Sequence, residues 1–386
     1  MATHDIDQLE AQGTLFASRR GEIAAGIYEA IRSCFAHWEA LPNFDFEAAF
    51  KDYLDEAFEA PDRLGFDLDT MRLIANLRNG HTAFADEWLW REHGAPIGFN
   101  ATHDEAGWRV TKSAYSDIAP GTRLVRIDDQ PIDEVASKLL VFVSGSSVRE
   151  QRNRLFSKPF LFPPSFEIMT DDGSKRQINR GTELPEDGAA TTGRWLEDER
   201  YLLTIPSFAQ PHFEADAIEL MKPLSDTVHL VIDVRGNSGG HTPNELVAAL
   251  MPTRYRFWNH VTPASNALAR AQGEPAYLVA SEAKWIQPLD GAFKGKLTIL
   301  IDSRTFSAAE DFVARFKDNK RAEIVGETTG GSSGQPYIRD LGDGIRLWVS
   351  AKRQIFPNGS SFEGLGIEPD TTTKWPPGAD FGMLPI

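Results

Sequence analysis

The chain has 386 residues, of which 41% are hydrophobic and 10% aromatic, so it can bury a sizeable core and does not read as a disordered chain. Its formal net charge of −16 argues against a nucleic-acid-binding protein, which would present a basic face. The single cysteine, Cys34, excludes an intrachain disulfide and a cysteine-based metal site. No stretch approaches the roughly 18 consecutive apolar residues of a membrane span. Residues 1–5 show no signal-peptide pattern, so we expect a cytoplasmic location.

The first part of the chain is expected to be helical. Apolar residues recur at helical spacing over residues 23–34 and again over residues 46–58. A third helix is expected over residues 68–77, followed by an Asn-Gly stop signal and then by His81. We therefore expect residues 1–90 to form an N-terminal helical region that ends at His81.

The next region, residues 91–193, shows short alternating segments typical of strands. Within it, residues 120–132 predict a turn, a strand, a tight hairpin and the start of a helix. This order resembles the core of a PDZ domain, although Thr122 and Gln130 replace the usual Asp and Gly. A plain β-rich insert is the alternative. Residues 185–193, rich in Pro, Gly, Ala and Thr, are expected to form a linker.

Residues 194–386 are expected to form an α/β core, because strand and helix patterns alternate there. The runs at 228–234 and 297–302 are almost unbroken apolar stretches, as buried strands of such a sheet should be. We expect strands at 201–206, 228–234, 297–302, 323–325 and 345–349, and helices at 242–251 and 307–319.

A glycine-rich turn follows the first of these buried strands. Residues 233–240 read Asp-Val-Arg-Gly-Asn-Ser-Gly-Gly. Such turns point N–H groups into a cleft, so this turn is a candidate source of a donor to an oxyanion. An ordinary turn between strand and helix is the alternative. A phosphate-binding loop is not expected, because no Lys-Ser or Lys-Thr follows.

A serine follows the second buried strand, and residues 307–310 read Ser-Ala-Ala-Glu. Ser307 would lie at the N-terminus of a helix, where unpaired N–H groups and the helix dipole stabilise negative charge near its hydroxyl. It is therefore a candidate nucleophile. The same four residues also form a capping box, which predicts a plain helix cap. Ser303 and Thr305 are competing hydroxyls.

Two further segments supply groups that a serine nucleophile needs. His81 is a candidate general base, and a surface or capping histidine is the alternative. His241, directly after the glycine turn, competes with it. Near the C-terminus, Glu363 and Glu368 are carboxylates able to orient an imidazole, and a solvated turn is the alternative.

In this order, the motifs resemble those of the C-terminal processing (tail-specific) serine peptidases and of the tricorn core peptidase. The resemblance covers residues 195–375 well, and residues 70–90 and 115–135 in outline. The family's Asp-x-Arg-Gly-Asn-x-Gly-Gly, Ser-Ala-Ser/Ala-Glu, Gly-Glu-x-Thr-x-Gly and Glu-Gly-x-Gly-Ile-x-Pro-Asp segments are matched by residues 233–240, 307–310, 326–331 and 363–370.

The two branches of the family differ in the base. Tail-specific proteases use a Lys after the Gly-Glu-x-Thr segment, but here Ser332 occupies that position, and no Lys lies between Lys320 and Lys352. The resemblance therefore implies the histidine-dependent, tricorn-like branch, with His81 as the base.

The resemblance also implies a mechanism. Ser307 would attack an acyl carbon while His81 takes the proton. Glu363 would orient His81 through hydrogen bonding, with another hydroxyl as a candidate member. The backbone N–H groups of Gly239 and Ala308 would hold the oxyanion.

For the fold, the resemblance implies an α/β core of ββα units, similar to the crotonase and ClpP spiral, with the helical region and the PDZ-like or β-rich insert beside it. It implies a serine peptidase acting on a peptide or protein substrate, without metal, nucleotide or organic cofactor. A homo-oligomer is left open. The alternatives are an esterase, amidase or cyclase on the same machinery, a non-catalytic relative that binds an apolar ligand, and a Ser-Lys enzyme using Lys352.

Overall fold

The computed structural model describes residues 13–185, 190–196, 199–264, 268, 272–274 and 276–374. Residues 1–5 and part of the expected linker lie outside them. The chain forms two compact units: unit 1 comprises residues 1–185, 262–279 and 335–352, and unit 2 comprises residues 186–261, 280–334 and 353–386. The division expected at residues 90 and 193 stays a prediction. Among the described residues, no helix combines the length and the apolarity needed to cross a membrane.

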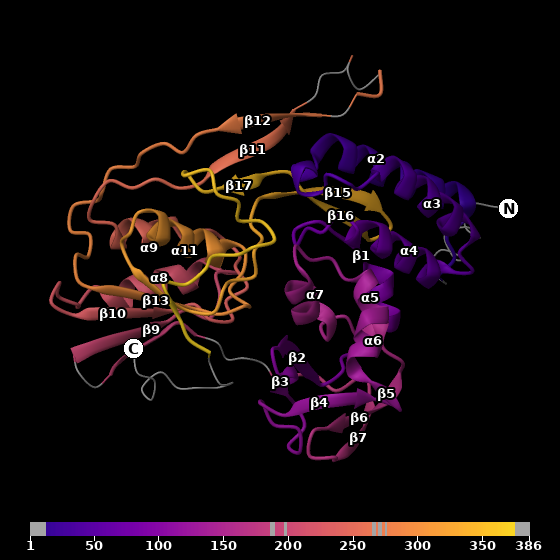
Figure 1. Ribbon diagram of the computed structural model, residues 1–386, viewed down its shortest axis with the longest axis horizontal. Helices are drawn as coiled ribbons and strands as arrows, with labels where there is room; N and C mark the ends of the chain where they lie inside the picture. Colours follow the sequence, from indigo (N-terminus) through magenta and orange to yellow (C-terminus); the bar gives the residue numbers. More distant parts are fainter. Residues whose placement is uncertain are drawn as a thin grey trace. The chain divides into compact units, whose positions relative to one another are not determined.

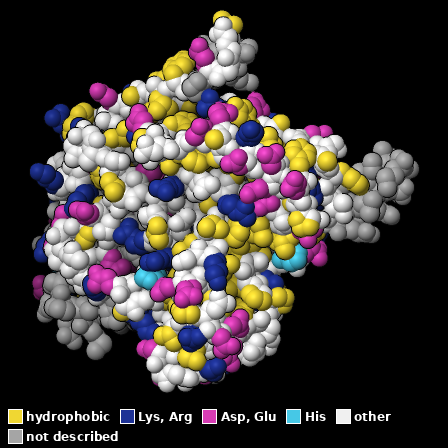
Figure 2. All heavy atoms as spheres, turned by 45° about the vertical axis from the view of Figure 1, so that its right-hand side comes forward, with side chains coloured by type: hydrophobic (Ala, Val, Ile, Leu, Met, Phe, Trp, Pro, Cys, Tyr) yellow, Lys and Arg dark blue, Asp and Glu magenta, His cyan; other side chains and the backbone are white. Residues whose placement is uncertain are grey.

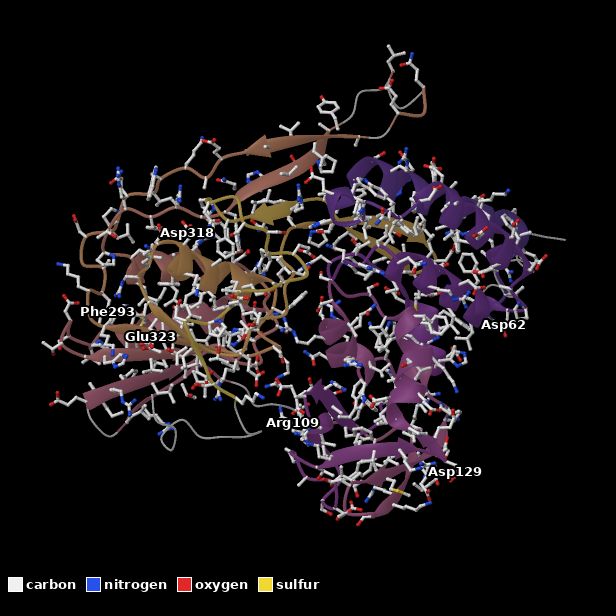
Figure 3. The ribbon with its side chains drawn as sticks, viewed as in Figure 1. Asp62, Arg109, Asp129, Phe293, Asp318 and Glu323 are labelled. Carbon is white, nitrogen blue, oxygen red and sulfur yellow. The ribbon has the colours of Figure 1, made fainter. Side chains whose placement is uncertain are left out.

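One part of unit 1 is helical, and its three long helices confirm the three that the periodicity predicts: α2 (Ala17–Cys34), α3 (Phe46–Glu59) and α4 (Arg63–Ala75). Helix α4 begins earlier than expected because Asp62, labelled in Figure 3, caps it. The Asp62 carboxylate accepts the Gly65 N–H at 2.8 Å. Cys34 is half-buried against this core, as expected of a small apolar residue.

A small antiparallel sheet completes this helical core. It has the order β1 (Ala83–Asp86), β16 (Ile345–Ser350) and β15 (Pro336–Gly342). The strand expected at 345–349 is thus present, but it pairs with β1 and β15 in unit 1 and not with the sheet of unit 2. Its inward-facing residues Ile345, Leu347 and Val349 are buried in the core formed with the helices.

The other part of unit 1 is a second antiparallel sheet with its own core, centred on buried aromatic residues such as Trp108 and Phe166. The strand, tight hairpin and helix expected over 120–132 are confirmed. The sheet order is β2 (Phe99–Asp104), β3 (Gly107–Ser113), β4 (Arg123–Ile127), β6 (Ser165–Thr170) and β7 (Lys175–Asn179), and β5 (Gln130–Pro131) also pairs with β4. Helices α6 (Ile132–Leu139) and α7 (Val148–Leu155) pack in the core of this sheet, whereas α5 (Glu87–His93) buries its Leu89 in the helical core.

Unit 2 is built on a six-stranded sheet whose strands run in chain order, which confirms an α/β class. From one edge the order is β18 (Thr371–Thr372), β14 (Glu323–Gly326), β13 (Leu297–Ile301), β10 (His229–Asp233), β9 (Arg200–Thr204) and β8 (Thr192–Trp195). All neighbours are parallel except β8 and β9. Each crossover between parallel strands leads to the next strand in the same direction across the sheet. Because such crossovers are right-handed, the helices that connect the strands all lie on the same face of the sheet.

The packing agrees with this topology. Helices α8 (Pro211–Met221), α9 (Asn244–Leu250) and α11 (Ala308–Asp318) pack with the strands in one large core. In Figure 1, α9 and α11 lie on one side of β13, β10 and β9. On the opposite face, the described residues form a small cluster that includes Val231 and Leu300. A separate three-stranded sheet has the order β12 (Tyr277–Ser281), β11 (Asn259–Ala264) and β17 (Arg353–Ile355).

Candidate active site

Three loops of unit 2 leave the same edge of the sheet. Strands β10, β13 and β14 are neighbours and parallel, so their carboxyl ends lie side by side, where α/β sheets bind ligands. The loops that follow them contain the glycine turn, Ser307 and the segment 327–334. Backbone pairing continues into these loops: the Val234 N–H donates to the Leu300 carbonyl, and the Glu327 N–H to the Ile301 carbonyl, each at 3.1 Å.

Ser307 has a strained backbone at the head of helix α11. Its φ of 57° and ψ of −122° correspond to the first central position of a type II′ turn (about +60°, −120°), which normally requires glycine. Such a conformation costs about 1–3 kcal/mol and persists only where the surroundings enforce it. Its N–H donates to a Glu310 carboxylate oxygen at 3.0 Å and to the Ser332 carbonyl at 3.2 Å. These hydrogen bonds hold the half-buried serine in its strained conformation, at the point where helix α11 begins.

The competing hydroxyls have other surroundings. Thr305 is fully buried, and its Oγ1 donates to the Val234 carbonyl at 3.0 Å, so its hydroxyl ties two loops together. Ser303 lies in the turn before it and does not begin a helix. Ser307 is therefore the hydroxyl that meets the geometric expectation for a nucleophile.

Gly239 lies directly against the Ser307 turn. A Cβ on Gly239 would lie 2.7 Å from the Ala308 nitrogen and 2.8 Å from the Ser307 Cβ, and the φ of Gly239 is +94°. No side chain fits at such distances, so glycine is required both by conformation and by close approach. The Ala308 N–H is the first of helix α11, and the first N–H groups of a helix have no partner within it. The two predicted oxyanion donors thus belong to neighbouring backbone segments.

Asn237 braces the glycine turn. It is fully buried, its Nδ2 donates to the Ile205 carbonyl at 3.0 Å, and its backbone carbonyl accepts the Phe306 N–H at 3.0 Å. Its Oδ1 accepts the Gly239 N–H at 2.9 Å. The Gly239 N–H, a predicted oxyanion donor, is therefore already hydrogen-bonded to Asn237. To bind an oxyanion, this N–H has to donate to both acceptors or break its bond to Asn237.

Asp302 connects the same two loops from the other side. Its Oδ1 accepts the N–H groups of Gly236 at 2.9 Å and of Thr305 at 3.0 Å, and Arg304 pairs with its Oδ2 at 2.8 Å. Burial alone would raise the pKa of Asp302, but Arg304 and the backbone donors outweigh it, so the pKa is lowered. An ionised carboxylate thus fixes the spacing between the glycine turn and the Ser307 turn.

Glu310 is a fully buried acid one turn into helix α11. Its carboxylate accepts from four donors, the Ser307 N–H at 3.0 Å, the Ser332 N–H at 3.1 Å, the Gly331 N–H at 2.7 Å and the Thr329 hydroxyl at 2.5 Å. Burial raises the pKa of Glu310 to about 8, against these four hydrogen bonds, which favour the ionised form. The glutamate of the expected capping box therefore also organises the loop after β14.

The C-terminal carboxylates differ in their surroundings. Glu363 is half-buried, and its Oε1 accepts the Ser332 hydroxyl at 2.7 Å. The next residue, Gly364, donates its N–H to the Gly331 carbonyl at 2.7 Å. Glu368 is exposed. Of the two sequence candidates, Glu363 is thus the one joined to the loop that also holds the Ser307 N–H.

His81 belongs to unit 1, at the end of the turn that follows α4. Its N–H donates to the Asn79 side chain at 3.0 Å. The preceding Gly80 is clamped by the region of α7: its N–H donates to the Ser146 hydroxyl at 2.8 Å, and its carbonyl accepts from Arg154 at 2.9 Å. Burial, and secondarily the positive charge of Arg154, lowers the pKa of His81 to about 3. The imidazole is therefore neutral at neutral pH. The competing His241 has an exposed side chain.

Several residues of the site, and one buried structural acid beside it, went unnoticed in the sequence. Asn237 and Glu310 were identified only as members of motifs. No local sequence pattern predicted the buried, hydrogen-bonded state of Asp311. Asp311 is buried, and its carboxylate accepts from Trp258 at 2.9 Å and from Ser333 at 2.5 Å. These partners lie 53 and 22 residues away in the chain, so local patterns do not reveal them. Within the described residues, no group of three or more His, Cys, Asp and Glu side chains is arranged to hold a metal ion.

The chain is similar in sequence to known peptidases. Residues 201–373 match the sequence profile of peptidase family S41. The carboxyl-terminal-processing peptidase 1 of Arabidopsis thaliana chloroplasts is 32% identical over 157 residues, which cover 40% of this chain and 30% of that protein. The carboxyl-terminal-processing protease of Synechocystis sp. is 24% identical over 216 residues, covering 52% of this chain and 47% of that protein. The match spans less than half the length of these relatives.

Solved structures resemble the fold. Mature CPAF superposes with a TM-score of 0.70 at 15% sequence identity, covering 92% of both chains. The photosystem II D1 C-terminal processing protease superposes with a TM-score of 0.53 at 18% identity, covering 92% of this chain and 93% of that one. The sequence match to peptidase family S41 thus covers residues 201–373, and the solved structures resemble the fold of the chain.

Proposed function

We propose that this protein is a serine peptidase that cleaves peptide or protein substrates through an acyl-enzyme on Ser307. The observation that carries the proposal is the glycine-like backbone of Ser307 at the head of α11, with Gly239 in contact with it. Strained backbone of this kind clusters at functional sites. The motif, the strand–turn–helix context and the family of residues 201–373 support the same role.

The proposed chemistry follows from the groups around Ser307. Its Oγ attacks the carbonyl carbon of the scissile bond, and the proton of the hydroxyl passes to His81. The Ala308 N–H holds the developing oxyanion, together with the Gly239 N–H when that group turns from Asn237. The protonated base then donates to the leaving amine, and water releases the acyl group by the reverse sequence.

His81 is proposed as the base because a base must be uncharged before it accepts a proton. Burial and Arg154 keep its pKa well below the ordinary value, so the neutral form dominates. The residue at the lysine position of the tail-specific branch is Ser332, which supports a histidine-dependent mechanism. Glu363 is proposed to orient the imidazole and to stabilise its protonated form.

The finer parts of the sequence interpretation belong to this proposal. We propose that the strands and helices of unit 2 are the ββα spiral implied by the family resemblance, and that residues 91–193 are a PDZ-like insert. The antiparallel sheet with a short hairpin and a following helix at 123–139 supports the second assignment. A cytoplasmic location is proposed on the sequence alone.

The test compares peptide and ester hydrolysis by the wild type and by Ser307→Ala. Fluorogenic peptides and an activated ester of the same acyl group are incubated with both proteins. The proposal predicts peptide cleavage that disappears in Ser307→Ala. Peptide cleavage that survives the substitution would contradict the nucleophile assignment. Ester cleavage without peptide cleavage would favour the alternative of an esterase on the same fold.

A further inference from the structure

Ser332 is in contact, through three separate groups, with the elements of the proposed site in unit 2. Its carbonyl accepts the Ser307 N–H at 3.2 Å, and its N–H donates to Glu310 at 3.1 Å. Its hydroxyl donates to the Glu363 carboxylate at 2.7 Å. The side chain is fully buried. One residue thus joins the nucleophile's backbone to the carboxylate proposed to orient the base.

From these contacts we infer that Ser332 is a positioning residue of the reaction, whose hydroxyl holds Glu363 in the orientation that supports the base. The inference rests on the proposed function and deepens it. A carboxylate on a three-bond side chain samples several rotamers unless a donor selects one. The Ser332 hydroxyl is such a donor, and the Ser307 and Glu310 bonds fix its backbone relative to the nucleophile. Glu363 is thereby placed relative to Ser307 through a single intervening residue.

The contacts of the loop explain why a hydroxyl serves at this position. The Ser332 N–H and the Gly331 N–H are both bound to Glu310, so the backbone of the loop cannot turn toward Glu363. The Ser332 hydroxyl is the group that donates to Glu363. A hydrogen bond to a charged group is worth about 1.5–3 kcal/mol, which corresponds to a change in rate of roughly 10- to 100-fold if the bond matters in the transition state.

The neighbouring Ser333 provides a matched control. It is equally buried and also donates its hydroxyl to a carboxylate, but that carboxylate is Asp311, at 2.5 Å. Both Ser332→Ala and Ser333→Ala therefore remove a buried serine-to-carboxylate hydrogen bond from the same loop. Only the first removes a bond to Glu363.

The experiment measures kcat and KM of the full chain on a fluorogenic peptide, together with the rate of labelling by a fluorophosphonate probe. We expect Ser332→Ala to lower kcat by about 10- to 100-fold with KM nearly unchanged, and to slow labelling similarly. Ser333→Ala should lower the melting temperature but leave kcat within about 3-fold of wild type, because its bond reaches only a structural acid. Ser332→Thr, which keeps the hydroxyl, should recover most of the activity if it melts like the wild type.

A double-mutant cycle separates positioning from general damage. If Ser332 acts through Glu363, then Ser332→Ala has little further effect on kcat in a Glu363→Ala background. Full additivity of the two losses, or equal losses in Ser332→Ala and Ser333→Ala, would overturn the inference. So would a Ser332→Ala enzyme with wild-type kcat, while Ser307→Ala is inactive. Activity that survives Ser307→Ala would instead refute the proposed function itself.

Discussion

The turns that carry Ser307 and His81 each lie close to a buried carboxylate, but the two carboxylates have different partners. In unit 2, Glu310 accepts hydrogen bonds from neutral groups, three backbone N–H groups and one hydroxyl. In unit 1, Glu150 is buried beside the His81 turn and forms an ion pair with Arg154, which also donates to the Gly80 carbonyl. The first arrangement fixes backbone geometry without adding a cation, and the second places a positive charge beside an imidazole.

This difference teaches what each turn contributes. The turn of the proposed nucleophile, Ser307, has to maintain a strained conformation, so its supports are short-range and directional. The turn of the proposed base, His81, has to keep an imidazole neutral, so burial and a nearby cation matter there. Substitutions around Ser307 should therefore change activity by altering the backbone geometry of its turn. Substitutions around His81 should change activity by altering the pKa of the imidazole.

The largest effect is expected from removing the proposed base, His81. His81→Ala should lower kcat/KM by about 10²- to 10⁴-fold, the usual contribution of a positioned general base. Lys352→Met should leave it nearly unchanged, because Lys352 is no part of the proposed mechanism. Steady-state kinetics on one fluorogenic peptide measures both. Loss of activity in Lys352→Met with an active His81→Ala would instead favour the Ser-Lys alternative.

A geometric disturbance at the nucleophile should come next. Gly239→Ala would place a methyl group 2.7 Å from the Ala308 nitrogen, so we expect kcat to fall by about 10²- to 10³-fold, the cost of a lost oxyanion donor. Gly291→Ala is the matched control, because Gly291 also has a positive φ, of +82°, but no atom within 4 Å of the added methyl. Equal activity losses in the two variants would show that backbone strain alone, and not close approach, explains the effect.

The raised pKa of Glu310 predicts a pH-dependent stability. Its pKa is about 8 in the folded chain against an ordinary value of 4.5, so between these values the folded state binds one more proton than the unfolded state. Stability contributed by this group therefore falls as pH rises from about 4.5 to 8, by at most about 1.4 kcal/mol per pH unit. Urea denaturation across this range should show a shallower decline in Glu310→Gln. An unchanged slope would mean that the four donors keep Glu310 ionised.

The smallest effect concerns the acid limb of the pH profile of kcat/KM. Because the pKa of His81 is lowered to about 3, kcat/KM should persist well below pH 6.5. Arg154→Met removes one of the two causes of the lowered pKa, so the acid limb of the pH–activity profile should move to higher pH. Burial, the other cause, should still keep the limb below pH 6.5. Arg152→Met, on the same helix but directed at His103, should leave the limb in place. A wild-type limb at the ordinary histidine value would contradict this account.

Much of the fold and part of the site follow from local sequence patterns. The buried strands β10 and β13 were predicted because residues buried on both faces form unbroken apolar runs. The end of one strand and the start of helix α11 placed Ser307 correctly. Periodicity did not predict which sheet the strand at 345–350 joins, because register and partner depend on tertiary packing.

The rest of the site depends on contacts between distant parts of the chain. The strained backbone of Ser307 is imposed by its surroundings, whereas its sequence reads only as a helix cap. The bond from Ser332 to Glu363 joins residues 31 positions apart, and that from Ser333 to Asp311 joins residues 22 apart. Side-chain networks of this kind have no sequence period, and so pattern reasoning finds their members only through a family resemblance.

The most direct test of the central claim is covalent labelling of the full chain with a fluorophosphonate, followed by peptide mass spectrometry. The account predicts one modified residue, Ser307, with labelling that is abolished in Ser307→Ala and slowed in His81→Ala. Modification at Ser303, at Thr305 or at no residue of an active preparation would contradict the claim that Ser307 is the nucleophile.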